Sequence, residues 1–199
     1  MKKFLHVGCG SKTKSKLKGF NSEDWQEIRF DIDPKVNPDI QGTLTDMVQV
    51  ESNSMDAIFS SHNIEHVYPY EVPIVLAEFH RVLKPDGIVV ITCPDLQSVC
   101  QAIVEDKLTD PLYGSPAGQI TPLDILYGYV PAMEKGNLFM AHRTGFTYSS
   151  LSSYFSKAGF KSIAGGRKPS AFELWLVAFK APTDSEKSIS IAQKFLPLK

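Results

Sequence analysis

The stretch Phe4-Leu5-His6-Val7-Gly8-Cys9-Gly10 decides the fold that we predict for this chain. Its first four residues are mostly apolar, as in a short buried strand, and two glycines follow at once. Glycine adopts backbone conformations closed to other residues and lets the main chain approach a ligand closely. The stretch therefore predicts a strand that ends in a ligand-binding turn, and we interpret the downstream segments as the other walls of that site.

Composition narrows the class of protein. The chain has 199 residues, 43% of them hydrophobic, and a net charge of −1. This length supports one sizeable core, and the near-neutral charge argues against nucleic acid or membrane as a partner. No apolar run approaches membrane-spanning length, and Cys9, Cys93 and Cys100 lack the spacing of a disulfide framework or a zinc site. We expect a cytoplasmic, reduced protein without a leader segment.

A lysine-rich segment follows the glycines. Lys12, Lys14, Lys16 and Lys18 alternate with small or polar residues, and helical periodicity is weak. We expect a loop with at most a short helix near residues 22–26. The lysines could form a cationic rim for an anionic substrate, or simply a solvated basic loop, and general experience favours the second interpretation.

Two acids follow the next predicted strands. The strand at residues 27–31 ends in Asp31, 21 positions after the last glycine. In nucleotide-binding βαβ units an acid at about this distance accepts hydrogen bonds from the ribose hydroxyls, although Asp31 could also be an ordinary turn acid. A weak strand at residues 40–44 leads to Asp46 and Met47. Asp46 could accept from the adenine amine with Met47 against the ring, or it could cap a helix.

The strand predicted at residues 55–61 runs into His62-Asn63-Ile64-Glu65-His66. Polar groups at the carboxyl end of a central strand are where open α/β sheets bind ligands. His62 and His66 are four positions apart, but the pattern is not HExxH and no third ligand follows at a recognisable spacing, so we predict no metal site. We expect His66 to be a partly buried structural residue. His62 is a candidate to line the site or accept a proton, and a structural role is equally compatible.

Strong periodicities predict the remaining core elements, which are helices at 71–83 and 149–158 and strands at 88–92, 160–164 and 173–179. The strand at 88–92 is continuous and β-branched, as in a parallel strand buried on both faces. A short glycine-rich loop joins the last two strands, so we expect them to pair antiparallel. The pattern predicts an α/β domain over residues 1–180, followed by a C-terminal tail at 181–199 that could be a docking helix or disordered.

Residues 95–146 interrupt the alternation of strands and helices. This insert, which we call the lid, is rich in tyrosine, glycine and proline. A long irregular segment inside a compact domain is usually functional, so we interpret it as a cover over a substrate. The residues that we select as substrate contacts are Tyr113, Tyr127, Tyr129, His142 and Arg143. Each tyrosine taken singly could instead only pack the lid on the sheet.

Four motifs in order resemble one family, the class I, Rossmann-like methyltransferases of the type-11 group, which use S-adenosylmethionine (SAM). The motifs are HVGCG, FDIDP, MDAIFSSHNIEHV and EFHRVLKPDGIVVITCPD. The resemblance covers roughly residues 4–95 and 144–180. It implies a doubly wound, mostly parallel seven-stranded sheet whose last strand is antiparallel. Two departures are His6, where the family commonly has an acid, and the loss of a third glycine and a strong first helix.

The resemblance also implies roles for individual residues. The expected SAM contacts run from the methionine part through the ribose and adenine to the reactive methyl, and they are Gly8, Cys9, Gly10, Asp31, Ile32, Asp46, Met47, Ser61 and His62. His62 and His142 are the candidate catalytic bases, because a hydroxyl or amine acceptor benefits from losing a proton.

The function that we expect is transfer of a methyl group from SAM to a small-molecule or sugar-type acceptor, with S-adenosylhomocysteine as the other product. One alternative is a non-catalytic SAM-binding or regulatory module, marked by His6 and the lysine loop. A second is an RNA or protein methyltransferase that uses the lysine loop as its basic contact. The sequence leaves the acceptor and the oligomeric state open.

Overall fold

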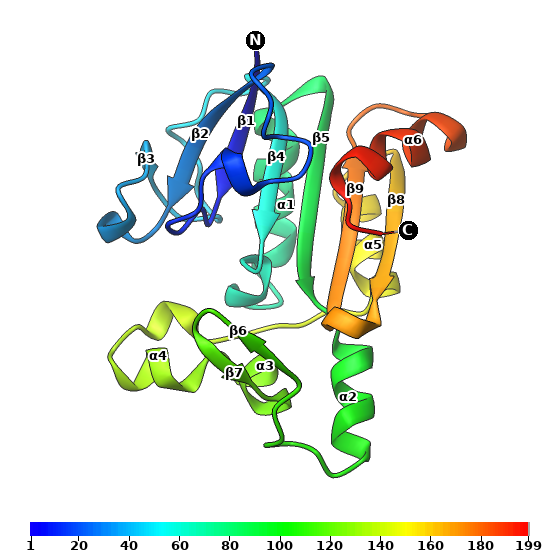
Figure 1. Ribbon diagram of the computed structural model, residues 1–199. Helices are drawn as coiled ribbons and strands as arrows, with labels where there is room; N and C mark the ends of the chain where they lie inside the picture. The colour runs from blue at the N-terminus through cyan, green and yellow to red at the C-terminus, as the bar shows by residue number, and fades with distance from the viewer. Residues whose placement is uncertain (199) are drawn as a thin grey trace.

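A seven-stranded sheet in the order β3-β2-β1-β4-β5-β9-β8 forms the centre of the computed structural model, which describes residues 1–198 (Figure 1). Its strands are β1 (Lys2–Val7), β2 (Trp25–Asp31), β3 (Ile40–Gln41), β4 (Met55–Ser61), β5 (Leu83–Pro94), β8 (Ser162–Lys168) and β9 (Glu173–Phe179). The first five are mutually parallel, and β9 runs antiparallel to both β5 and β8. The predicted fold class and the antiparallel last strand are confirmed.

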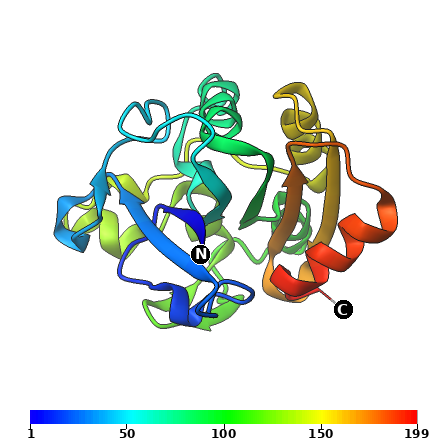
Figure 2. The ribbon, with the colours of Figure 1, turned by 90° about the horizontal axis from the view of Figure 1, so that it is seen from above.

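Helices α1 (Val72–Val82) and α5 (Tyr148–Lys157) cover one face of the sheet (Figure 2). The apolar stripe predicted for the first of them is buried, since Val75, Leu76 and Phe79 have no exposed surface. These side chains pack with residues of β1, β4, β5 and β9 in the larger of two apolar clusters. The 3.6-residue period of the sequence therefore located this face of the core directly.

A loop and the C-terminal helix cover the opposite face of the sheet. No α-helix lies between β1 and β2. Residues 11–24 form a loop with one short 3₁₀ helix, η1 (Lys14–Lys16), and the short helix expected near residues 22–26 is not formed. The segment predicted as a C-terminal tail forms α6 (Ser185–Phe195), which packs on this face (Figure 2). The Phe20 ring lies 4.3 Å from the Phe4 ring and 4.8 Å from the Phe195 ring, centroid to centroid. Aromatic residues of the loop and of α6 thus bury the apolar surface that a helix after β1 would cover.

The lid lies beyond the carboxyl ends of the parallel strands (Figure 1). It contains α2 (Leu96–Val104), a hairpin of β6 (Tyr113–Ser115) and β7 (Gly118–Ile120), α3 (Pro122–Tyr127), α4 (Val130–Glu134) and the 3₁₀ helix η4 (Leu138–Met140). The hairpin is absent from our sequence interpretation, because its strands are only three residues long.

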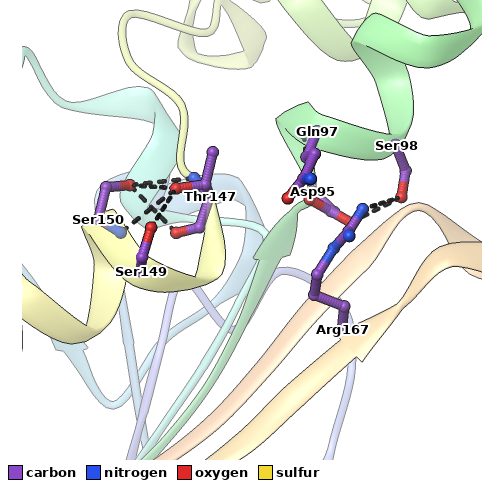
Figure 3. Close-up of polar contacts among 7 residues, drawn as sticks. All are labelled: Asp95, Gln97, Ser98, Thr147, Ser149, Ser150 and Arg167. Atoms are coloured by element: carbon purple, nitrogen blue, oxygen red, sulfur yellow. Dashed lines mark hydrogen bonds and ion pairs between the residues drawn. The ribbon is translucent and has the colours of Figure 1, made fainter.

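The two ends of the lid are held next to each other. The Leu96 N–H donates to the Phe146 carbonyl at 3.0 Å. The fully buried Asp95 caps α2 and pairs with Arg167 of β8 at 2.8 Å, while Thr147 starts α5 with a capping box (Figure 3). Both caps satisfy main-chain N–H groups that a helix start leaves free. The lid is therefore an insert whose entry and exit are fixed to the sheet.

Three short 3₁₀ helices complete the fold: η2 (Pro34–Val36) after β2, η3 (Ile64–His66) after β4 and η5 (Pro169–Ala171) between β8 and β9. Within residues 1–198, no helix has the length and apolar character needed to cross a membrane.

Candidate active site

A cleft of about 320 Å³ lies where the carboxyl ends of β1, β2 and β4 face the lid. We call it the larger cleft. Of the residues predicted to hold the cofactor, those that line it are Gly8, Gly10, Asp31, Ile32 and His62. Strand ends and lid residues thus meet around one hollow, at the edge of the sheet where parallel α/β folds bind ligands.

Both glycines of the turn after β1 take conformations that suit glycine. Gly8 has φ +61° and Gly10 has φ +51°, in the left-handed region. A Cβ atom on Gly8 would lie 2.4 Å from the Asn63 side chain, whereas a Cβ on Gly10 would meet no atom within 4 Å. The turn is therefore packed closely on one side and open on the other, where the main chain borders the cleft.

Asp31 orders this turn and keeps capacity to bind a ligand. Its carboxylate accepts hydrogen bonds from the Gly10 N–H at 2.8 Å and from the Asp33 N–H at 2.9 Å. A carboxylate has about four lone-pair sites, so two remain for hydroxyl groups in the cleft. Ile32 beside it is 43% exposed and offers an apolar surface suited to a flat base.

The lining chemistry fits SAM. Asp31, Asp33 and Glu71 contribute carboxylates to the larger cleft, where Arg143 and His62 are the cationic side chains among its lining residues. Carboxylates suit ribose hydroxyls and the positive charge of a sulfonium, whereas a pyrophosphate calls for N–H groups at a helix N-terminus. A cofactor with a ribose, a base and a cationic sulfur is therefore compatible with the residues present.

Four expected cofactor contacts lie elsewhere. Cys9 and Met47 are buried in the interior, Asp46 is exposed to solvent, and Ser61 is half-buried, and none of the four lines the larger cleft. Burial raises the pKa of the Cys9 thiol to about 11. The residues that line this wall instead are Thr43, Leu44 and Thr45. Sequence reasoning missed them because β3 is only two residues long, so the chain reaches the cleft earlier than expected.

A second hollow of about 190 Å³ adjoins the first beneath the lid. We call it the smaller pocket. It shares His62, His66 and Met140 with the larger cleft. Of the residues predicted to contact substrate, Tyr113, Tyr129 and His142 line it.

The other two predicted substrate contacts take different positions. Tyr127 is 62% exposed and lines neither hollow. Arg143 lines the larger cleft instead of the smaller pocket, and its guanidinium stacks on the Tyr68 ring at 4.8 Å from the centroid. The lid therefore supplies residues to both hollows.

His62 stands at the junction of the two hollows in a strained conformation, with φ +49°. Its Nδ1 lies 3.5 Å from the Glu65 carboxylate and its Nε2 lies 3.5 Å from the Glu173 carboxylate. Removal from water lowers the pKa of His62, although 38% of its side chain is accessible. The carboxylates of Glu173 and Glu65 outweigh this effect and raise the pKa of His62 to about 9. His62 is therefore an imidazolium at neutral pH.

Glu65, His66 and His142 form a cluster on the wall of the smaller pocket. Burial alone would raise the pKa of the Glu65 carboxyl, but His62 and then the other two imidazoles hold it below its usual value. Burial lowers the pKa of His142, whose Nδ1–H donates to the Ile125 carbonyl at 2.7 Å. Sequence reasoning gave Glu65 no role. A glutamate four residues after a buried strand was nevertheless a signal, because buried glutamates are rare without a partner.

His6 replaces the acid common in the family, and the structure supplies an acid from the next strand. The buried His6 ring donates from Nδ1 to Glu27 Oε1 of β2 at 2.7 Å. The other Glu27 oxygen accepts from the Lys14 N–H at 2.9 Å. His6 and Glu27 therefore anchor the loop that stands in place of the missing helix.

This pair predicts a pH dependence of stability. Burial lowers the pKa of His6 below its usual value, and the Glu27 hydrogen bond offsets this only in part. As the pH falls through about 6.5, the unfolded chain binds the proton before the folded chain, so the free energy of unfolding falls, with a limiting slope of about 1.4 kcal/mol per pH unit. Urea denaturation between pH 7.5 and 5.5 should show less loss for His6→Asn, which keeps a donor but does not titrate. Equal losses in both proteins would contradict the assignment.

Comparisons with known proteins agree with this geometry. The type-11 family model described as a methyltransferase domain matches residues 5–91. No curated protein matches the sequence. Among solved structures, the chain is similar to a protein from Pyrococcus horikoshii OT3 (TM-score 0.60, 13% identity, 91% of this chain and 82% of that one). It is also similar to a SAM-dependent methyltransferase from Methanosarcina mazei (TM-score 0.58, 15% identity, 91% and 93%).

A third similar structure is a SAM-dependent methyltransferase from Thermotoga maritima, described as a possible histamine N-methyltransferase (TM-score 0.56, 15% identity, 91% and 83%). The chain also covers 47% of the chain of the citrinin polyketide synthase CMeT domain structure, at 11% identity and a TM-score of 0.55. At these identities the likeness shows the fold alone, and the family match covers residues 5–91. Over residues 5–91 the chain is similar to the methyltransferase domain family, and its fold is that of solved SAM-dependent methyltransferases.

Proposed function

We propose that the protein transfers the SAM methyl group to a hydroxyl or amine of a small-molecule or sugar-type acceptor. The observation that carries this proposal is the junction of two hollows at His62, one lined by Gly8, Gly10 and Asp31 and the other covered by the lid. A pocket of about 190 Å³ suits a small acceptor better than a duplex or a folded protein surface.

In this proposal the larger cleft holds the cofactor. Asp31 accepts hydrogen bonds from the ribose hydroxyls, Ile32 and Leu44 flank the base, and the Gly8–Gly10 main chain borders the methionine part. When bound, SAM supplies a methyl group on a positively charged sulfur that is already a good leaving group. The protein's main contribution is then to position the acceptor and exclude water.

The smaller pocket holds the acceptor and takes its proton. Because the Nδ1–H of His142 is committed to the Ile125 carbonyl, its Nε2 carries a free lone pair. His62 has a carboxylate beside each ring nitrogen, so both nitrogens retain their protons. This arrangement favours His142 as the base and His62 as a cationic positioning residue.

The two alternative functions receive less support. His6, which would mark a non-catalytic module, is matched by Glu27. In the lysine loop, the Lys14 ammonium donates to the Trp25 carbonyl and the Lys18 ammonium to the Gln193 carbonyl. None of the four loop lysines lines either hollow. These contacts give the loop a structural role and weaken its interpretation as a substrate rim or an RNA contact.

Two measurements test the proposed function. Isothermal titration calorimetry should detect SAM binding with micromolar affinity, and the absence of binding at millimolar SAM would overturn it. Release of S-adenosylhomocysteine should then be measured with small alcohols, amines and sugars, and with RNA and peptides for comparison. Turnover with small acceptors supports the proposal. Turnover confined to RNA and abolished by salt would replace it, because phosphate contacts are salt-sensitive.

A further inference from the structure

Three potential metal ligands converge beneath the lid from distant parts of the chain. Glu65 and His66 belong to η3, directly after β4, and His142 comes from the far end of the lid. One ligand atom from each side chain lies within 4.8 Å of the other two. The lid is fixed here, because the Glu65 carbonyl accepts hydrogen bonds from the N–H groups of Arg143 and Thr144 at 2.8 and 3.2 Å.

Both imidazoles make the main-chain hydrogen bond that is usual for metal-binding histidines. The Nδ1–H of His66 donates to the Ala141 carbonyl at 3.1 Å, and that of His142 donates to the Ile125 carbonyl at 2.7 Å. A carbonyl only accepts, so each Nδ1 carries the proton and each Nε2 presents a free lone pair. A hydrogen bond from the second ring nitrogen to a main-chain carbonyl is the usual support of a metal-binding histidine.

The Glu65 carboxylate is left without hydrogen bonds. Its residue is 1% exposed, and within residues 1–198 neither Oε1 nor Oε2 has a hydrogen-bond partner. The 3.5 Å approach of His62 Nδ1 to Oε1 is an ion-pair contact. Burying an ionised carboxylate that has one ion pair and no hydrogen bond is costly, so such groups in native proteins usually have a further ordered partner or an ion. This group points to a missing ligand.

We propose that Glu65, His66 and His142 bind a divalent first-row metal ion, such as Zn²⁺, Mn²⁺ or Co²⁺. Three atoms at most 4.8 Å apart all lie within about 2.8 Å (4.8/√3) of one point, so shifts of under about 1 Å reach the 2.0–2.2 Å of zinc ligation. Two imidazoles and a carboxylate select these ions over Mg²⁺ or Ca²⁺, which prefer oxygen ligands. Our sequence analysis predicted no metal because the third ligand, His142, follows at no recognisable spacing.

The place of the ion suggests its use, and this part rests on the proposed function. All three ligands line the smaller pocket, so the open coordination positions face the acceptor. The ion would bind an acceptor hydroxyl, or both oxygens of a vicinal diol, and lower the hydroxyl pKa. The O–H proton passes to solvent, the oxygen forms a bond to the methyl carbon, and the C–S bond breaks with its electrons remaining on sulfur. In the metal-bound protein the cation thus replaces the His142 lone pair in activating the acceptor.

Metal binding is tested without any acceptor. Protein freed of metal by chelation should take up one equivalent of Zn²⁺ in calorimetry and elemental analysis, and Co²⁺ should give visible absorption bands typical of nitrogen and oxygen ligation. Glu65→Gln and His66→Gln should each weaken Zn²⁺ binding by at least about 100-fold. His80→Gln is the matched control, because His80 lies on α1 against Phe160 and should bind Zn²⁺ as the wild type does.

Several results would overturn this proposal. The first is that none of Zn²⁺, Mn²⁺ and Co²⁺ binds at about 100 µM, which we take as the weakest affinity of interest. The second is that the wild type and both ligand variants bind Zn²⁺ equally. If Glu65→Gln fails to fold by circular dichroism, His142→Gln supplies the second test from the lid. SAM titration of the same samples separates the two proposals. SAM binding without metal uptake overturns only the metal site, and metal uptake without SAM binding overturns the proposed function.

Discussion

Replacing Asp31 with alanine is expected to weaken SAM binding by at least about 100-fold. In the proposed complex the carboxylate accepts hydrogen bonds from two ribose hydroxyls, and a hydrogen bond to a charged group contributes about 1.5–3 kcal/mol. Two such bonds exceed the 2.7 kcal/mol or so that corresponds to 100-fold in affinity. The substitution also frees the Gly10 N–H, which Asp31 now fixes at 2.8 Å. Calorimetric titration with SAM measures the effect.

Asp33→Ala is the matched control for this experiment. Asp33 lines the same cleft two residues later, but its Oδ1 accepts from the Lys35 N–H and caps η2. We therefore expect a small loss of local stability and a change in SAM affinity of under about threefold, since a cap contributes about 1 kcal/mol to the helix alone. Asp31→Ala protein that is folded and binds SAM like the wild type would remove Asp31 from the cofactor site.

His142→Gln is expected to lower turnover by about 100-fold or more while SAM affinity changes little. General-base catalysis contributes 10²–10⁴-fold in typical cases, and His142 lines the smaller pocket but not the larger cleft. The measurement is release of S-adenosylhomocysteine with the acceptor found in the panel, compared with calorimetry of SAM. The expected split between turnover and affinity separates a role at the acceptor from a general loss of structure.

His80→Gln controls for this substitution as well, because His80 lies on α1, away from both hollows. Unchanged turnover in His142→Gln, or an equal loss of SAM affinity, would contradict the assignment. Because His142 is also a ligand of the proposed cation, its turnover alone does not distinguish a direct base from metal activation. The Zn²⁺ titrations of Glu65→Gln and His66→Gln make that distinction.

Local patterns in the sequence predicted the part of the site that local geometry builds. Gly8, Gly10 and Asp31 are determined by a strand, a turn and the end of the next parallel strand, and all three line the larger cleft. Met47 shows the limit of the same reasoning. The sequence places it near the cleft, but β3 ends at Gln41 and the Met47 side chain packs into the core. A shift of a few residues in one short strand changes which side chains face the ligand.

The covering of the second face was not predictable from periodicity. Residues 185–195 have a modest apolar stripe, which is equally compatible with a tail. Only the folded structure shows that the missing helix after β1 leaves Phe4, Phe20 and Trp25 to be covered and that Phe195 of α6 packs on them. The requirement to bury apolar surface is a property of the whole sheet, so no single segment reveals it.

The sequence by itself determined the parallel sheet, its antiparallel last strand, the glycine turn and the acid at the end of β2. These follow from hydrophobic periods and turn chemistry, which act over a few residues. The tertiary structure alone decided that Glu27 would pair with His6, that Glu173 would reach His62, and that His142 would meet Glu65 and His66. Those contacts join segments far apart in the chain, and their geometry depends on strand register and on how the lid folds back. Distances of a few ångströms between such segments set the charges and ligand positions of the site, and they exist only in the folded protein.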